Sequence, residues 1–344
     1  MKYTVLITTY NRAQLLDQTL RYMARIECGD PWEVIVVDNN STDETRTIVE
    51  RAQPASSVPL TYLFEPVQGK SAALNTGIRA SRGSIIVMTD DDVAPEPDWL
   101  ERCGEGFDRF ACDYVGGKVL PMWEEQPPSW LPNRRGQHWA VLALLDFGPE
   151  PLEVGRNGVR WPLGANLAAR RDAFDRAGWW DNDFDRQGNS LRGQGQREWC
   201  LRARAAGLHG YYLPDMVVHH HVPKERLDKR YFRRWSYWNG VSRAILYDKL
   251  AVDMESPDDS PLDFSTVPHL AGVPRYMWRT AAAVAVRMFL ARLRRDEIDE
   301  FEQEMRLWFF AGIVRQRWDD RHGVRRSPVY AAANGADPSK VRPA

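Results

Sequence analysis

Short apolar runs and longer amphipathic stretches alternate along residues 1–100 of the chain. Runs rich in β-branched residues predict four strands, over residues 3–10, 32–37, 60–64 and 85–89. Apolar residues spaced three or four positions apart follow each of the first three runs, and they predict helices over residues 15–23, 45–52 and 72–79. This repeated alternation predicts an α/β fold with a parallel sheet wound with helices.

Each of these predicted strands is followed by polar side chains. Because the carboxyl ends of parallel strands meet at one edge of a sheet, we expect these side chains to share one rim. A rim that combines carboxylates with a lysine and an arginine suits a nucleoside diphosphate. Its members are Thr8, Thr9, Tyr10, Asn11 and Arg12 after the first strand, Asp38, Asn39 and Asn40 after the second, Gln68, Gly69 and Lys70 after the third, and Asp90 and Asp92 after the fourth.

The consecutive aspartates Asp90, Asp91 and Asp92 stand out in that rim. In an extended backbone Asp90 and Asp92 leave on the same side, roughly 7 Å apart at about 3.3 Å per residue. That spacing can hold one hard cation, since Mg²⁺ and Mn²⁺ take one or two carboxylates together with waters and phosphates. The alternative is an acidic turn that caps a helix starting near Pro97.

The composition of the chain limits which binding partners and which cellular compartment are expected. Basic and acidic residues nearly balance, with a formal net charge of -1, so no general affinity for nucleic acid is expected. The four cysteines show no CxxC or metal-ligand spacing, which fits a reducing cytoplasm. The amino terminus does not fit a signal peptide, and no apolar run reaches the roughly 18 to 20 residues of a spanning helix. We therefore expect a cytoplasmic protein, with peripheral contact at the inner face of the cell membrane left open.

Four ordered motifs carry a resemblance to a known family. They are residues 5–12 (VLITTYNR), 36–43 (VVDNNSTD), 69–75 (GKSAALN) and 88–92 (MTDDD). In this order and spacing the chain resembles family 2 glycosyltransferases of the GT-A fold over roughly residues 1–225. The resemblance implies a wound, mixed and mainly parallel sheet flanked by helices, and it implies an inverting, metal-dependent transfer of sugar from a nucleoside-diphosphate sugar.

The same resemblance implies roles for individual residues. Thr9 and Asp38 would hold the nucleoside, Lys70 would bind it or the phosphates, and residues 90–92 would form the DXD motif. A strand near the end of the domain would return a histidine to the metal. The expected donor site comprises Thr8, Thr9, Tyr10, Arg12, Asp38, Asn40, Lys70, Asn75, Asp90, Asp91 and Asn166, and the expected ligands of Mn²⁺ or Mg²⁺ are Asp90, Asp92 and His221.

Catalysis by inversion needs a carboxylate that takes the proton of the attacking hydroxyl. In the family this base lies in a Glu-Asp pair opening a helix, but here that pair is missing and its position falls on or near Gln196. We expect Glu198 to serve as the base, followed by Asp181 and Asp183. The alternative for Glu198 is a first-turn residue favoured by the helix dipole.

Outside the motifs, the chain offers two further hypotheses. The tryptophans Trp123, Trp130 and Trp139 form either an acceptor platform or part of the core. After a catalytic domain over residues 1–225, residues 226–320 are expected to form a helical extension and residues 321–344 a disordered tail. Within the extension, residues 277–293 carry an apolar face with arginine borders, which suits either a lipid interface or a solvated helix packed on the domain.

The sequence therefore predicts a glycosyltransferase of the hexosyltransferase type. Its acceptor would be a hydroxyl of a glycan, a lipid-linked glycan or a small molecule, in cell-envelope polysaccharide synthesis. The missing Glu-Asp pair motivates an alternative, a degenerate domain that binds sugar nucleotide or glycan without turnover. A sugar-1-phosphate nucleotidyltransferase is a further alternative, although the chain has no glycine-rich phosphate loop after its first strand.

Overall fold

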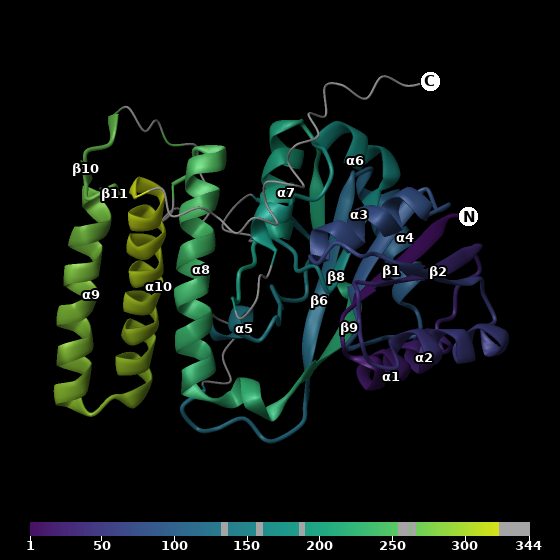
Figure 1. Cartoon of the computed structure of the whole chain (residues 1–344), viewed down its shortest axis with the longest axis horizontal. Coiled ribbons are helices and arrows are strands. Elements are labelled where there is room, and N and C mark those ends of the chain that lie inside the picture. Colours follow the sequence, from purple (N-terminus) through teal and green to yellow (C-terminus); the bar gives the residue numbers. More distant parts are fainter. Residues whose placement is uncertain (132–136, 156–160, 186–189, 254–261, 263–265, 323–344) are drawn as a thin grey trace.

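The computed structural model describes residues 1–131, 137–155, 161–185, 190–253, 262 and 266–322. One sheet with helices on both faces makes up most of the molecule, and a group of long helices stands beside it (Figure 1). The strands are β1 (Tyr3–Thr9), β2 (Trp32–Asp38), β3 (Leu60–Phe64), β4 (Ile85–Asp90), β5 (Val93–Pro95), β6 (Tyr114–Trp123), β7 (Leu152–Glu153), β8 (Asn166–Arg170) and β9 (Gly210–Val222), with a separate hairpin of β10 (His269–Leu270) and β11 (Val273–Pro274).

The helices follow the strands as the apolar spacing predicts. Helices α1 to α3 connect the first four strands, and their positions agree with the three predicted helices. The α-helices are α1 (Ala13–Met23), α2 (Thr45–Ala52), α3 (Lys70–Ala80), α4 (Trp99–Phe110), α5 (Gln137–Val141), α6 (Arg171–Ala177), α7 (Gly195–Ala205), α8 (Lys229–Leu250), α9 (Arg275–Arg294) and α10 (Glu297–Arg321). Short 3₁₀ turns occupy Gln53–Ala55, Asn182–Phe184 and Lys224–Leu227.

The sheet is mixed, with the parallel strands of the amino-terminal half at one side. Its order is β3-β2-β1-β4-β8-β6-β9-β5, and β1 pairs in parallel with both β2 and β4. Strand β8 runs antiparallel between β4 and β6, while β6 and β9 are parallel to each other. The expected α/β fold with a wound, mixed sheet is confirmed. All four carboxyl ends of β1 to β4 meet at one edge, as their parallel pairing requires.

The core lies in two apolar layers, one on each face of the sheet. Along β1, Val5 and Ile7 face the layer covered by α1, α2 and α4, whereas Leu6 faces the layer covered by α3, α6 and α7. Since successive side chains of a strand alternate in direction, a strand buried on both faces has to be apolar throughout. This requirement explains the unbroken apolar run in β2.

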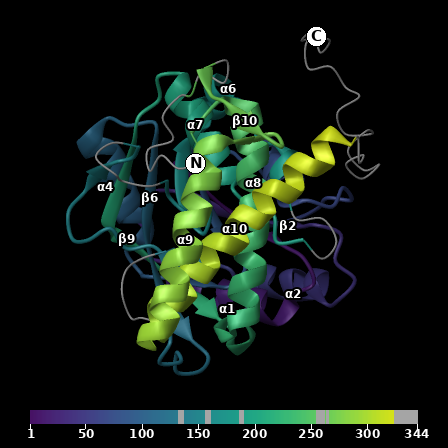
Figure 2. The same ribbon diagram turned by 90° about the vertical axis from the view of Figure 1, so that its left-hand side faces the viewer.

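The long helices α8 to α10 begin where the sequence predicts the helical extension. Helix α8 is not separate from the catalytic domain, because its residues Val241 and Ile245 pack in the same apolar layer as Trp199 of α7. Helix α10 lies along α8, and α9 is the outermost of the three (Figure 1). In Figure 2, seen from that side, α9 and α10 cross in front of α8. Residues 323–344 of the expected tail lie outside the described residues.

No helix in the described part of the chain is both long enough and apolar enough to cross a membrane.

Candidate active site

A cavity of about 580 Å³ opens at the edge where β1 to β4 end. It runs from the parallel strands to the start of α7 and to α8, so the side chains around it come from distant parts of the sequence. Its lining from the predicted rim comprises Thr8, Thr9, Tyr10, Arg12, Asn39, Gln68, Gly69, Lys70, Asp90, Asp91 and Asp92. Most of the rim expected from the strand ends is therefore brought together around one cavity, whereas Asn11, Asp38 and Asn40 do not line it.

The aspartate run is arranged differently from the extended backbone expected for it. Strand β4 ends at Asp90 and the chain then turns, so the alternation that would pair Asp90 with Asp92 is lost. Instead, Asp91 and Asp92 both bind Arg12, whose two guanidinium nitrogens lie 2.7 Å from Asp91 Oδ1 and 2.8 Å from Asp92 Oδ2. Thr9 donates a hydrogen bond of 2.7 Å to Asp91 Oδ2. Asp90 stands apart and forms an ion pair with Lys70.

Burial and these neighbours set the charge of the two inner carboxylates. Burial raises the pKa of Asp91 to about 6, and the nearby charge of Asp92 adds to this although Arg12 opposes it. For Asp92, burial favours the protonated form, but His220, Arg12 and Arg226 outweigh it and hold its pKa well below the usual value. Asp92 therefore stays ionised while it is almost completely buried.

A histidine faces Asp92, but it is His220 and not the expected His221. His220 is buried, lines the cavity, and has Nε2 3.5 Å from Asp92 Oδ1. His221 uses its backbone N–H to donate to Asp92 O, and its side chain does not line the cavity. Because neighbouring residues of β9 alternate in direction, only every second histidine of the triplet can face this way.

Several of the expected donor residues hold the backbone together instead of lining the cavity. Asp38 accepts from Ser41 N and from the Tyr62 hydroxyl, both at 2.8 Å. Asn166 is fully buried, where it accepts from Trp99 Nε1 and donates to two carbonyl oxygens. Asn75 exchanges two hydrogen bonds with the backbone of Trp180, and Asn40 is exposed outside the cavity.

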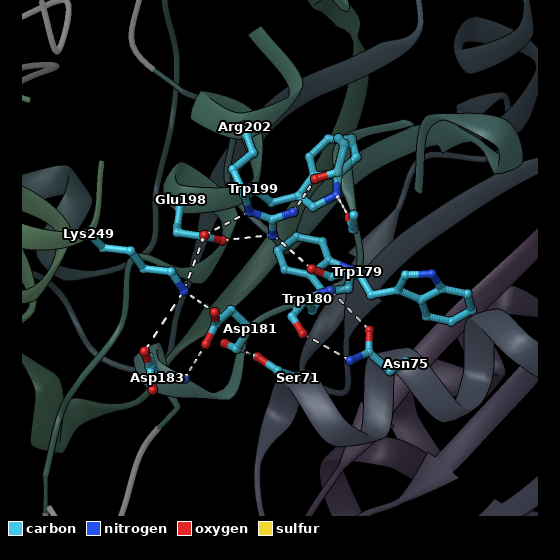
Figure 3. A network of polar contacts seen from close by, with 12 residues as sticks. Ser71, Asn75, Trp179, Trp180, Asp181, Asp183, Glu198, Trp199, Arg202 and Lys249 are labelled. Carbon is cyan, nitrogen blue, oxygen red and sulfur yellow. Dashed lines mark hydrogen bonds and ion pairs between the residues drawn. The ribbon is translucent and has the colours of Figure 1, made fainter. Parts of the chain in front are cut away.

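The expected catalytic residues Glu198, Asp181 and Asp183 form a network of ion pairs beside the cavity (Figure 3). Glu198 is 0% exposed, and Arg202 donates to both of its oxygens, at 2.7 and 2.9 Å. Lys249 of α8 pairs with Asp181 and lies 3.6 Å from Glu198 and 3.8 Å from Asp183. Glu198 does not line the cavity and both of its oxygens are bound by Arg202, so this geometry argues against Glu198 as the base.

One carboxylate of the described cavity lining lies outside the aspartate run, and it is Asp185. It is 8% exposed, and it accepts hydrogen bonds from Ser71 N and from Ser71 Oγ at the start of α3. Burial raises its pKa to about 6, although the bonds from Ser71 and the charge of Lys70 act in the opposite direction. Asp185 lines the cavity and has the raised proton affinity that general-base chemistry needs, and both of its oxygens accept hydrogen bonds from Ser71.

Sequence reasoning missed several residues that line the cavity. Contributions from α8 were not predictable, because the packing of a distant helix leaves no local signal. The missed residues are Asp185, His220, Arg226, Trp235 and Asn239.

The tryptophans expected as an acceptor platform pack in the core. Trp123, Trp130 and Trp139 are partly buried against the first apolar layer, and none of them lines the cavity. Trp130 packs edge-on against Phe232 and Phe301, with ring centroids 5.2 and 5.0 Å apart. Trp180 and Trp235 are the tryptophans of the described cavity lining.

This arrangement of fold and site agrees with comparisons to known proteins. The model of the family described as Glycosyl transferase family 2 matches residues 4–176. The chain therefore belongs to glycosyltransferase family 2, and it is a glycosyltransferase as the sequence predicts.

Two relatives from Haloferax volcanii illustrate the similarity. Glycosyltransferase AglE is 34% identical over 232 residues, which cover 67% of this chain and 70% of the relative. A glucosyl-dolichyl phosphate glucuronosyltransferase is 25% identical over 251 residues, covering 72% of this chain and 77% of the relative. Among solved structures, the mannosyltransferase PcManGT from Pyrobaculum calidifontis, in complex with GDP-Man and Mn²⁺, superposes with a TM-score of 0.63 at 22% identity, covering 92% of this chain and 87% of its own. This likeness confirms a fold of the GT-A type.

Proposed function

We propose that this glycosyltransferase moves a sugar, with inversion at the anomeric carbon and with a divalent cation, from a nucleoside-diphosphate sugar to an acceptor hydroxyl. One observation carries the proposal: Asp90, Asp91 and Asp92 share a cavity with Arg12 and Lys70 at the edge where parallel strands end. Such an edge is where open α/β sheets bind their ligands. Basic side chains facing carboxylates there suit a diphosphate that arrives with a cation.

The residues around Asp92 fit a divalent cation. Among the described residues the buried oxygen Asp92 Oδ1 accepts no hydrogen bond of normal geometry, although His220 Nε2 lies 3.5 Å from it, and the other ring nitrogen, His220 Nδ1, has no hydrogen-bond partner. The described chain contains no cluster of three or more side chains placed to hold a metal. A site of this kind suits Mn²⁺ or Mg²⁺, which complete their coordination with waters and substrate phosphates. PcManGT, solved with GDP-Man and Mn²⁺, supports this assignment.

Asp92 would hold the cation together with His220, in place of the expected His221, whereas Asp90 is paired with Lys70 and stands apart from them. The bound cation would supply positive charge that offsets the charge developing on the departing diphosphate. Arg12 and Lys70 would share this role, since both line the cavity as fixed positive charges. Thr8, Thr9 and Tyr10 would contact the donor from the end of β1.

We assign the general base to Asp185. In the proposed step the acceptor oxygen attacks the anomeric carbon from the face opposite the diphosphate, and the proton of its hydroxyl passes to Asp185. The bond between the anomeric carbon and the diphosphate oxygen breaks, and its electron pair leaves with the diphosphate. Gln196 lines the cavity near the position where relatives of this kind are expected to carry their base, but an amide cannot take a proton there.

We further propose a glycan or a lipid-linked glycan as the acceptor, encountered at the cytoplasmic face of a membrane. A glucosyl-dolichyl phosphate glucuronosyltransferase among the relatives supports a lipid-linked acceptor. Such an acceptor requires the enzyme to work against a membrane surface, and we place that peripheral contact on the C-terminal helices.

A thermal-shift screen tests the donor site directly. UDP, GDP, dTDP and CDP are added with Mn²⁺, with Mg²⁺ or with EDTA, because a ligand that binds the native state raises the melting temperature. One nucleotide is expected to raise it only in the presence of the cation. The matching sugar nucleotide is then assayed for release of the nucleoside diphosphate. A shift without any turnover, with or without acceptor, would favour a domain that binds the donor but does not transfer it.

A further inference from the structure

Helix α9 is held in the molecule along one narrow line. Its buried side chains are Met277, Val284 and Ala291, which recur every seven residues and therefore lie on one face. Met277 packs in a small apolar cluster with Ile313 of α10, so this line faces the rest of the helical extension. Most of the remaining surface of α9 is exposed.

The face of α9 opposite that line is also apolar. Ala282, Val286, Phe289, Leu290 and Leu293 follow one another at helical spacing and, at about 100° per residue, lie on the outward side. Phe289 is 59% exposed and Leu293 is 65% exposed. A helix that is apolar on two opposite faces normally has both of them covered. In the described part of the chain, only the inner face is covered.

The charges beside this outward face have one sign. The twenty residues of α9 include five arginines and no acidic residue, and Arg295 follows directly. On the helical wheel Arg287 and Arg294 lie on one side of the apolar face and Arg292 on the other, whereas Arg275 and Arg279 lie on the outward side itself, in the turns that precede the apolar residues. Arg292 lies 3.9 Å from Glu300 of α10, which is the acidic group that faces this border.

We propose that the outward face of α9 docks on an anionic lipid surface, with Phe289 and Leu293 in the acyl boundary and the bordering arginines at the headgroups. An apolar face between basic borders is the pattern of helices that lie in the plane of a membrane interface. The position of α9 as the outermost helix leaves the face open to a flat surface (Figures 1 and 2). The proposal rests on the proposed membrane contact of this glycosyltransferase, to which it assigns a surface and a lipid charge.

A second copy of the chain fits this face less well than lipid does. Two copies that met through α9 about a two-fold axis would bring the same arginine borders together. Like charges at a desolvated contact are unfavourable, whereas anionic headgroups neutralise them.

Vesicle co-sedimentation of the full chain tests the proposal. Vesicles of phosphatidylcholine alone are compared with vesicles that also contain phosphatidylglycerol, at low and high salt. We expect at least tenfold stronger binding to the anionic vesicles at low salt, and loss of that binding in the double variant Phe289→Asp, Leu293→Asp. The variant Phe64→Asp is the matched control, because Phe64 is 50% exposed on β3, outside α9, and its loss is expected to leave vesicle binding intact.

Melting temperature and nucleotide-induced shift are measured on the same variants without vesicles. Unchanged values show that the α9 variant folds and that its donor site is intact, so failure of docking is separated from failure of the donor site. Equal binding to both kinds of vesicle, or none, overturns the proposal. The proposal is also overturned if the wild-type protein is a dimer and the α9 variant is a monomer, since the face would then be an interface between copies.

Discussion

The charged side chains around Asp92 are paired with one another before any donor binds. Arg12 forms ion pairs with both Asp91 and Asp92, and Lys70 forms an ion pair with Asp90. A sugar nucleotide adds further negative charge to this cavity, and that charge has to be offset for binding to be favourable. Cation binding is expected to be most favourable at Asp92 Oδ1, because this buried oxygen accepts no hydrogen bond from the described residues and the carboxylate is already desolvated.

Asp92→Asn is therefore expected to remove the dependence on metal. The amide keeps the size of the side chain but loses its charge, so transfer should fall about 100-fold or more, equivalent to roughly 3 kcal/mol. The Mn²⁺-dependent nucleotide shift should disappear in the same variant. Asp108→Asn, at an exposed carboxylate of α4, serves as the control. Retention of a full Mn²⁺-dependent shift in Asp92→Asn would place the cation elsewhere.

The pH dependence of transfer tests Asp185 as the base. A base acts in its ionised form, so with a pKa raised to about 6 the value of kcat/KM should fall about tenfold per pH unit below that point. The pKa of Asp91 is raised to about 6 as well, so the wild-type profile alone does not identify the group.

Asp185→Asn separates the two carboxylates. We expect a loss of about 100-fold or more in kcat/KM and a flattened acid limb, with the nucleotide-induced shift in melting temperature retained. If Asp185→Asn kept kcat/KM within twofold of wild type at every pH from about 5 to 8, Asp185 would be excluded as the base.

At the scale of elements, the start of α7 takes part in ion pairs that join neighbouring elements. Glu198 joins Arg202 of the same helix to Lys249 of α8, and Lys249 in turn reaches Asp181 after α6 (Figure 3). The network therefore ties the helical extension to the loop that carries Trp180 and Asp185 along the cavity. Glu198 is the fully buried charge of this network, so it depends on its partners.

Glu198→Gln is expected to lower stability more than chemistry. Removing the Glu198 charge leaves Arg202 without its buried counter-charge, at a cost of about 3 kcal/mol in the free energy of unfolding, whereas Lys249 keeps Asp181 and Asp183. Denaturant unfolding measures this loss, and kcat of the folded fraction should change by less than tenfold. Unchanged stability together with abolished turnover would restore Glu198 as the base. Glu105→Gln, at an exposed residue of α4, is the control.

Local periodicity was sufficient to predict the strands and helices of the parallel half. The third strand, Leu60–Phe64, and the second helix, Thr45–Ala52, lie where their patterns place them, because alternation and helical spacing act over a few residues. The rim of the site followed from the same patterns. The direction of single side chains did not, since the turn after Asp90 and the burial of Glu198 depend on distant packing.

At the scale of the whole molecule, α8 and α10 meet at an unusually close crossing. A Cβ atom on Gly312 would lie 1.9 Å from Tyr237 O of α8, and one on Gly240 would lie 1.9 Å from Phe309 O of α10. Two glycines thus allow the two backbones to touch, and any side chain there would force the helices apart.

Gly312→Ala is expected to destabilise the helical extension. Because the obstructing atom belongs to the backbone, neither helix can relieve the clash by rotating a side chain, and we expect a loss of about 2 to 3 kcal/mol. Differential scanning calorimetry of the full chain measures the change. Gly29→Ala is the control, since nothing lies within 4 Å of the added Cβ at that position. If Gly312→Ala had the melting temperature of wild type, the backbones of α8 and α10 would be able to accommodate the added methyl group.

Because of the glycine crossing, the carboxyl-terminal helices form a rigid connection of fixed length between the outermost helix and the sheet. One end of this connection packs in the apolar layer that also contains Trp199, and the other end carries Phe289 and Leu293. If that far end rests on lipid, the mouth of the cavity stands at a constant height above the bilayer.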